Sequence, residues 1–193
     1  MYVKFKFSRL FQSTAAAQQK GANVTPEQAA FFVEMLLPQV QKEYLTTRRV
    51  LKAVPIAKES YRPHPDSRSA FELAWHIASS DIWFLDGFLT GKFEMDDDSI
   101  PADLGNTEDI LALYEDGFES KLPEVKKLTP EFWATPRPFF GIYNNPMALY
   151  LQFMLHHAIH HRGQLSTYLR PMGAKVPNIY GGSFDEPWTE PEA

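Results

Sequence analysis

The chain has 193 residues, a formal net charge of −5 at pH 7 and no cysteine. This length suits one domain with a sizeable core. The acidic balance argues against a nucleic-acid-binding protein, which usually carries a basic surface. Without cysteine the chain forms no disulfide and offers no thiolate, so a bound metal must be held by nitrogen and oxygen ligands.

The ends of the chain set the domain limits. Residues 1–24 are basic and contain no acidic side chain, as in some targeting segments, but they lack the apolar centre of a secretory signal. We interpret 1–24 as a flexible or loosely docked N-terminal extension, 25–187 as one helical domain, and 188–193 as a C-terminal tail. No stretch approaches the roughly 20 apolar residues of a membrane span, so we expect no membrane partner. The absence of cysteine fits the cytoplasm.

Helical periodicity dominates the sequence, and strand-type alternation is nowhere sustained. The first helix is predicted to begin in "TPEQ", where Thr25 is the N-cap, Pro26 is the first helical residue and Gln28 completes a capping box. It is expected to run to about Val54, with a kink or break near Pro38.

Three more helices are predicted. The second follows the N-cap Ser69 and ends near Leu89, before a glycine. The third covers about 108–128. The stretch "TPEFWATPRPFFGIYNNP" is predicted to be irregular, and the fourth helix is expected from 145 to 170. Four long amphipathic helices predict an all-α four-helix bundle with long crossover connections and an irregular Pro/Gly-rich C-terminal tail.

Four of the six histidines stand together in "HHAIHH" at 156–161. Because residues four apart share a helix face, the cluster contains two candidate pairs: His156 with His160, and His157 with His161. The stripe that includes His157 and His161 is otherwise apolar, whereas the other stripe is polar. We therefore predict that His157 and His161 face the bundle interior.

Two buried imidazoles need partners, because each unsatisfied polar group costs about 1–3 kcal/mol. A hydrogen-bonded core or a metal ion would both supply them, and H-x-x-x-H also occurs by chance. His76 is the candidate third ligand, since it lies within the apolar stripe of the second helix and facing helices of a bundle can bring such side chains to one metal. Three imidazoles leave coordination positions open for water or substrate.

Three segments resemble the DinB/YfiT-like metal-binding four-helix-bundle proteins: "ELAWHIASSDIWFLDG", "HAIHHRGQLSTYLRPMG" and "KVPNIYGGSFDE". The resemblance covers roughly residues 26–187. It implies a metal triad made by one histidine of the second helix and two of the fourth, which fall on His76, His157 and His161. It also implies a homodimer and a divalent ion such as zinc or nickel. Related branches use the metal to activate a low-molecular-weight thiol for transfer or isomerisation.

These observations predict a metal-dependent enzyme, of the thiol-transferase or hydrolase type, acting on a small molecule. The alternative is a non-catalytic metal-binding bundle that acts in stress response or through a dimer surface. A helical scaffold without metal is a third interpretation. A metalloprotease is disfavoured, because no glutamate stands between the paired histidines. Three imidazoles suit zinc, nickel, copper or iron.

Side chains near the triad are candidates for accessory roles. His160 is a candidate proton relay, although its polar stripe predicts a surface position. Gln164 is placed to hydrogen-bond a ligand imidazole or to pack as a half-buried amide. Arg162 is expected to form a structural ion pair, and Asp81 is a weaker candidate for a partner of a ligand.

Overall fold

A computed structural model of the chain describes residues 23–94 and 99–188. The predicted N-terminal extension lies almost wholly outside the described residues. In the described part, no helix combines the length and apolar character that crossing a membrane requires. In chain order the elements are α1 (Pro26–Lys52), the 3-10 helix η2 (Ile56–Lys58), α2 (Ala70–Thr90), α3 (Thr107–Val125), α4 (Pro130–Ala134), β1 (Pro136–Phe139), β2 (Tyr143–Pro146), the 3-10 helix η3 (Met147–Leu149) and α5 (Tyr150–Leu169).

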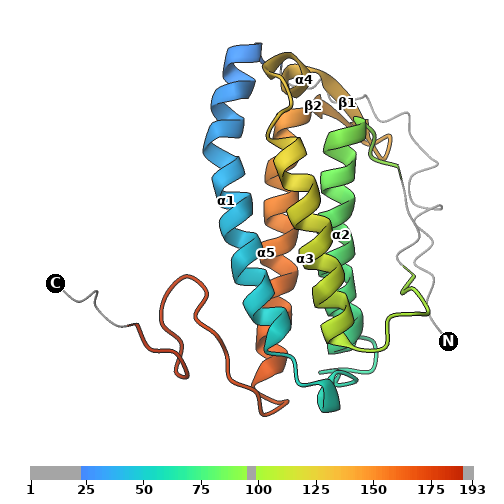
Figure 1. The fold of residues 1–193 in the computed structure, drawn as a ribbon, viewed down its shortest axis with the longest axis vertical. Coiled ribbons are helices and arrows are strands. Elements are labelled where there is room, and N and C mark those ends of the chain that lie inside the picture. The colour runs from blue at the N-terminus through green and yellow to red at the C-terminus, as the bar shows by residue number, and fades with distance from the viewer. Residues whose placement is uncertain (1–22, 95–98, 189–193) are drawn as a thin grey trace.

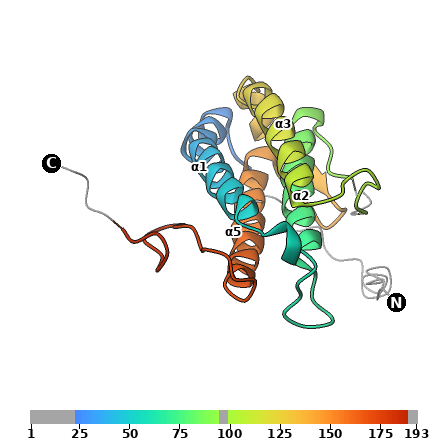
Figure 2. The same ribbon diagram turned by 60° about the horizontal axis from the view of Figure 1, so that its bottom comes forward.

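Helices α1, α2, α3 and α5 form the predicted four-helix bundle (Figure 1). Around the bundle, α1 neighbours α5, α5 neighbours α2, α2 neighbours α3, and α3 neighbours α1 (Figure 2). Helices α1 and α5 run in one direction and α2 and α3 in the other. Since α2 ends at one end of the bundle and α3 begins at the other, their connection spans its length. The predicted crossover is confirmed.

Capping side chains set the starts of three long helices. Thr25, Ser69 and Asn106 each accept from the backbone N–H three residues later, and the side chain at that position bonds back to the cap. These reciprocal bonds satisfy N–H groups that have no partner within the helix. Gly91 ends α2 with φ 72°, a left-handed conformation that glycine adopts without steric cost. The predicted starts and the predicted stop before this glycine are confirmed.

The sequence predicts a kink or a break near Pro38, and of these the structure excludes the break. Helix α1 continues through Pro38 without a break. Pro38 is exposed, so water can satisfy the carbonyl that loses its helical partner.

The stretch predicted to be irregular contains a hairpin. Strands β1 and β2 pair antiparallel, with Phe139 opposite Tyr143. The Tyr150 hydroxyl accepts the backbone N–H of Asn145 at 3.0 Å and donates to the Arg137 carbonyl at 2.7 Å, which ties both strands to the start of α5. The prediction that the fourth helix begins at Asn145 is therefore wrong: residue 145 lies in β2, and a 3-10 turn precedes α5.

A buried ion pair joins α5 to α1. The Arg162 guanidinium, whose side chain is 1% exposed, pairs with the Glu43 carboxylate. The Tyr180 hydroxyl, from the C-terminal tail, donates to Glu43 at 2.9 Å and accepts from Arg162 at 2.6 Å. The predicted structural ion pair of Arg162 is confirmed, and it also attaches the tail to the bundle.

We expect Glu43→Ala to lower the free energy of unfolding by about 3–5 kcal/mol, because it leaves a buried guanidinium without its counter-ion. Urea denaturation measures this loss. The control is Glu124→Ala, which removes an exposed pair with Lys127 and should change stability by less than about 0.5 kcal/mol. Equal losses in the two variants would contradict a structural role for the buried pair.

Candidate metal centre

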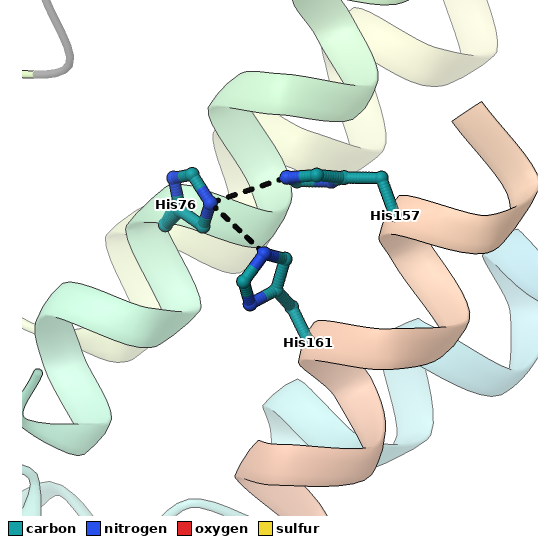
Figure 3. Close-up of side chains that lie close together, drawn as sticks. All are labelled: His76, His157 and His161. Atoms are coloured by element: carbon teal, nitrogen blue, oxygen red, sulfur yellow. Dashed lines mark hydrogen bonds between the residues drawn. The ribbon is translucent and has the colours of Figure 1, made fainter. Parts of the chain in front are cut away.

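Three histidines converge where α2 packs against α5 (Figure 3). The Nε2 atom of His76, on α2, lies 3.2 Å from Nε2 of His157 and 3.3 Å from Nε2 of His161, both on α5. One ring nitrogen from each side chain lies within 4.8 Å of the other two. The structure thus brings together the three residues that the sequence analysis selected.

The phase of α5 explains which histidines take part. His157 and His161 are half-buried on the side that faces α2, whereas His156 and His160 are exposed. The predicted facing of the two pairs is confirmed. Because α2 and α5 are antiparallel neighbours, one half-buried residue of α2 meets two residues of α5 that are one turn apart.

The spacing of the nitrogens fits a divalent ion. Nitrogens bound about 2.0–2.1 Å from a tetrahedral zinc ion lie about 3.3–3.4 Å from each other. Hydrogen bonds among the rings serve the site less well. A ring nitrogen carries either a proton or a lone pair, so Nε2 of His76 cannot donate to one histidine and accept from the other. A cation accepts all three lone pairs at once.

The other nitrogens of the α5 rings also favour binding through Nε2. The Nδ1 atom of His161 lies 2.8 Å from Oε1 of Gln164. An amide oxygen only accepts, so Nδ1 carries the proton and Nε2 presents its lone pair to the site. The Nδ1 atom of His157 is buried and has no hydrogen-bond partner among the described residues. The polar contact of this ring is therefore made through Nε2, which lies 3.2 Å from Nε2 of His76.

The surroundings keep the α5 imidazoles neutral. Burial, followed by the neighbouring His161 and His76, lowers the pKa of His157 to about 3. Burial also lowers the pKa of His161 to about 4, although the hydrogen bond to Gln164 opposes this shift. Both rings are therefore unprotonated at neutral pH, the state in which imidazole binds metal.

The remaining candidates take different positions. His160 is exposed and its ring packs edge-on against His161, with centroids 4.7 Å apart. Asp81 is buried and accepts from the Tyr114 hydroxyl at 2.7 Å. Burial raises the pKa of Asp81 to about 7. Asp81 does not belong to the group of side chains within reach of one metal, which holds only the three histidines among the described residues.

Two further residues shape the surroundings of the site, and sequence reasoning missed the second of them, Glu43. The Phe84 ring lies 6.3 Å from the His157 ring, so it contributes to the apolar surroundings of the site. Glu43 fixes Arg162, the residue that follows the ligand candidate His161. A charged residue between Val40 and Thr47, on the buried stripe of α1, was the available signal for Glu43.

Together, the bundle and its donor set define a helical protein able to hold a divalent ion between two antiparallel helices. The model of the DinB family matches residues 8–193, and the chain belongs to that family.

Relatives support this assignment. The chain is 32% identical over 147 residues to the uncharacterized protein YjoA of Bacillus subtilis (strain 168), covering 70% of this chain and 90% of YjoA. It is 27% identical over 115 residues to the uncharacterized protein YrdA of the same organism, covering 59% of this chain and 67% of YrdA.

Two solved structures share the fold. A DinB-like protein from Bacillus cereus ATCC 10987 superimposes with a TM-score of 0.64 and 24% identity, over 77% of this chain and 97% of that chain. The structure of YjoA superimposes with a TM-score of 0.60 and 22% identity, over 76% and 97%.

Untagged protein should bind one zinc ion per chain. We expect His157→Ala to weaken zinc binding by at least about a hundredfold, since even partners of metal ligands contribute 10–100-fold. Gln164→Ala should weaken it by about tenfold, because His161 loses the acceptor that fixes its proton. Isothermal titration against a competing chelator measures both effects. His156→Ala, on the same helix but exposed, should leave the affinity unchanged; a loss in this control would contradict the assignment.

The lowered histidine pKa values predict how stability changes with pH in chelator-treated protein. Below the ordinary pKa of 6.5 the unfolded chain takes up protons at His157 and His161. The folded chain does not until pH approaches about 3 at His157 and about 4 at His161. The free energy of unfolding is therefore not reduced by these two rings above pH 6.5, and it decreases as pH falls from 6.5 toward their folded-state pKa values. The raised pKa of Asp81 has the opposite effect, because this carboxyl makes the folded state more stable as pH falls.

Comparison with a variant isolates the histidine effect. Between pH 7 and 4.5, the melting temperature of the wild type should fall more than that of the double variant His157→Gln, His161→Gln. Asp81 is present in both proteins, so its effect cancels. Circular dichroism measures the melting temperatures. An equal fall with pH in the two proteins would show that the two rings are not held neutral by burial.

Proposed function

We propose that this chain is a metal-dependent enzyme in which His76, His157 and His161 hold a zinc or nickel ion that acts on a small molecule. The convergence of three imidazole nitrogens within 4.8 Å of one another, with Nε2 of His76 3.2 Å and 3.3 Å from the other two, carries the proposal. Three protein ligands leave positions open for a substrate atom, whereas structural zinc sites are closed by four. The half-buried position of all three rings leaves those positions within reach of solvent.

The reaction that suits this site best is the transfer of a low-molecular-weight thiol. A divalent ion lowers the pKa of a bound thiol, so that the thiolate forms at neutral pH. The protein's own residues orient the candidate ligands. Gln164 fixes the proton of His161 on Nδ1, and the apolar contact with Phe84 limits water at His157. The thiol proton would pass to solvent as the thiolate forms. The sulfur would then bond to an electrophilic carbon, with the carbon–leaving-group bond breaking and the leaving group departing with its electron pair.

Hydrolysis is the less favoured reaction. Attack by water is usually assisted by a general base within hydrogen-bond reach. Among the described residues, no carboxylate joins the histidine group, and exposed His160 packs its ring against His161. A thiol has a lower pKa than water and needs less assistance to ionise.

The proposal extends to location and assembly. The cytoplasm keeps small thiols reduced, so we place the reaction there.

We also propose a homodimer. Phe184 and Trp188, in the C-terminal tail, are 89% and 67% exposed, and a second copy of the chain would cover such apolar surface.

Metal-loaded protein should accelerate the conjugation of glutathione or cysteine to 1-chloro-2,4-dinitrobenzene, followed by absorbance. The rate should fall to background in His76→Ala and after chelation, because both remove the bound thiolate. His156→Ala, which leaves the triad intact, should keep the wild-type rate. Hydrolysis of p-nitrophenyl acetate without thiol-dependent conjugation would favour a hydrolase. Metal binding without either reaction would favour a non-catalytic bundle.

A further inference from the structure

Aromatic side chains line the contact between α2 and α5 on the side of the histidines that lies toward the hairpin. We call this set the aromatic strip. Its members are Trp83, Phe84, Phe139, Phe140, Tyr143 and Phe153.

Ring contacts connect the strip to the candidate metal centre without a gap. The Phe84 ring lies 6.3 Å from His157 and 6.0 Å from Phe139, on which it stacks. Phe139 in turn lies 5.5 Å from Phe153. The centroid distances are those of packed aromatic pairs. Phe84 and Phe139 are buried, at 5% and 7% exposed, so they form the apolar packing that runs from a candidate ligand to the more exposed rings at the hairpin.

The strip follows the partly open edge of the contact between the two helices. On α5, Phe153 lies one turn before His157, which lies one turn before His161. On α2, Trp83 lies seven residues, or about two turns, after His76. All five side chains are half-buried. The residues that continue the two histidine stripes therefore share the histidines' access to solvent.

The tip of the hairpin places one more ring on this edge at a conformational cost. Phe140 has φ 53°, a left-handed conformation that non-glycine residues rarely adopt. Its ring stacks on Trp83 at 5.3 Å and 19°, yet 41% of the residue stays exposed. Because the Phe140 side chain stays partly exposed, its burial offsets little of the energetic cost of this conformation. The hairpin turn, in which Gly141 also has a positive φ of 70° and the Ile142 N–H donates to the Phe139 carbonyl, holds the Phe140 ring in this exposed position.

We propose that the aromatic strip binds an apolar, ring-bearing part of the small molecule whose donor or reacting atom lies at the histidine triad. This inference rests on the proposed function and narrows its substrate class. No strip member carries a charge at neutral pH, so the strip selects apolar groups. Its continuity with the triad requires a ligand that combines such a group with a metal-binding or reacting end.

The test uses cobalt-loaded protein, whose visible absorption reports a thiol bound to the metal. The probes are 2-mercaptoethanol and 3-phenylpropane-1-thiol, which share the thiol and differ in the ring. Wild type should bind the phenyl thiol at least about tenfold more tightly, because the strip removes part of the ring from water. In Phe153→Ala and Phe140→Gly the preference should fall to less than about threefold, with 2-mercaptoethanol bound as in wild type.

Two controls separate binding from folding. Phe140→Gly relieves the left-handed strain, so its melting temperature should equal or exceed that of wild type. Phe31→Ala removes a ring of α1 that is 65% exposed and lies outside the strip, and it should keep the full preference. Equal affinities of the two thiols in wild type, or a preference kept in both strip variants, would overturn the inference.

A metal-free measurement makes this inference separable from the proposed function. The indole N–H of Trp83 donates to the Glu94 carbonyl at 2.9 Å, and its NMR signal can be assigned with Trp83→Phe. Adding 3-phenylpropan-1-ol, which has no thiol, should shift this signal in chelator-treated wild type and not in Phe140→Gly. A protein that binds no cobalt but shows this shift would refute the metal chemistry alone; cobalt binding without the shift or the preference would refute the strip alone.

Discussion

The buried pair of Arg162 and Glu43 fixes how α5 is rotated within the bundle. A guanidinium that is 1% exposed requires its carboxylate, so the Arg162 side of α5 must face α1. His161 is the preceding residue, about 100° around the helix, and this rotation turns it and His157 toward α2. The same pair holds the tail through Tyr180. One interaction therefore sets both the direction of the candidate ligands and the attachment of the C-terminal segment.

Much of this arrangement follows from local sequence rules. Capping residues determine the helix starts, and a residue spacing of four on a helix separates His157 and His161 from His156 and His160. The hairpin was missed because its strands are short and proline-containing. It also depends on the Tyr150 hydroxyl at the start of α5 and on the left-handed conformation of Phe140, which no strand pattern indicates. The partner of Arg162 and the distances between the nitrogens depend on how the helices pack, which no local pattern contains.

Apolar surroundings give the histidine site two properties at once. They hold the pKa of His157 and of His161 well below the ordinary value, so the lone pairs are available at neutral pH. They also continue as the aromatic strip, through the contact of Phe84 with His157. Under the proposal made above, the same side chains would select an apolar substrate and keep the candidate ligands neutral.

His76 lies 81 residues before His157 and 85 before His161, and with a metal at the triad this separation would link metal supply to the lifetime of the protein. An unfolded chain does not gather His76 with His157 and His161, so an ion that binds the triad binds the folded state. A free ion concentration of a hundred times its Kd would add about 2.7 kcal/mol to the folding equilibrium. In a cell short of that ion, the unloaded protein would open more often and be degraded sooner.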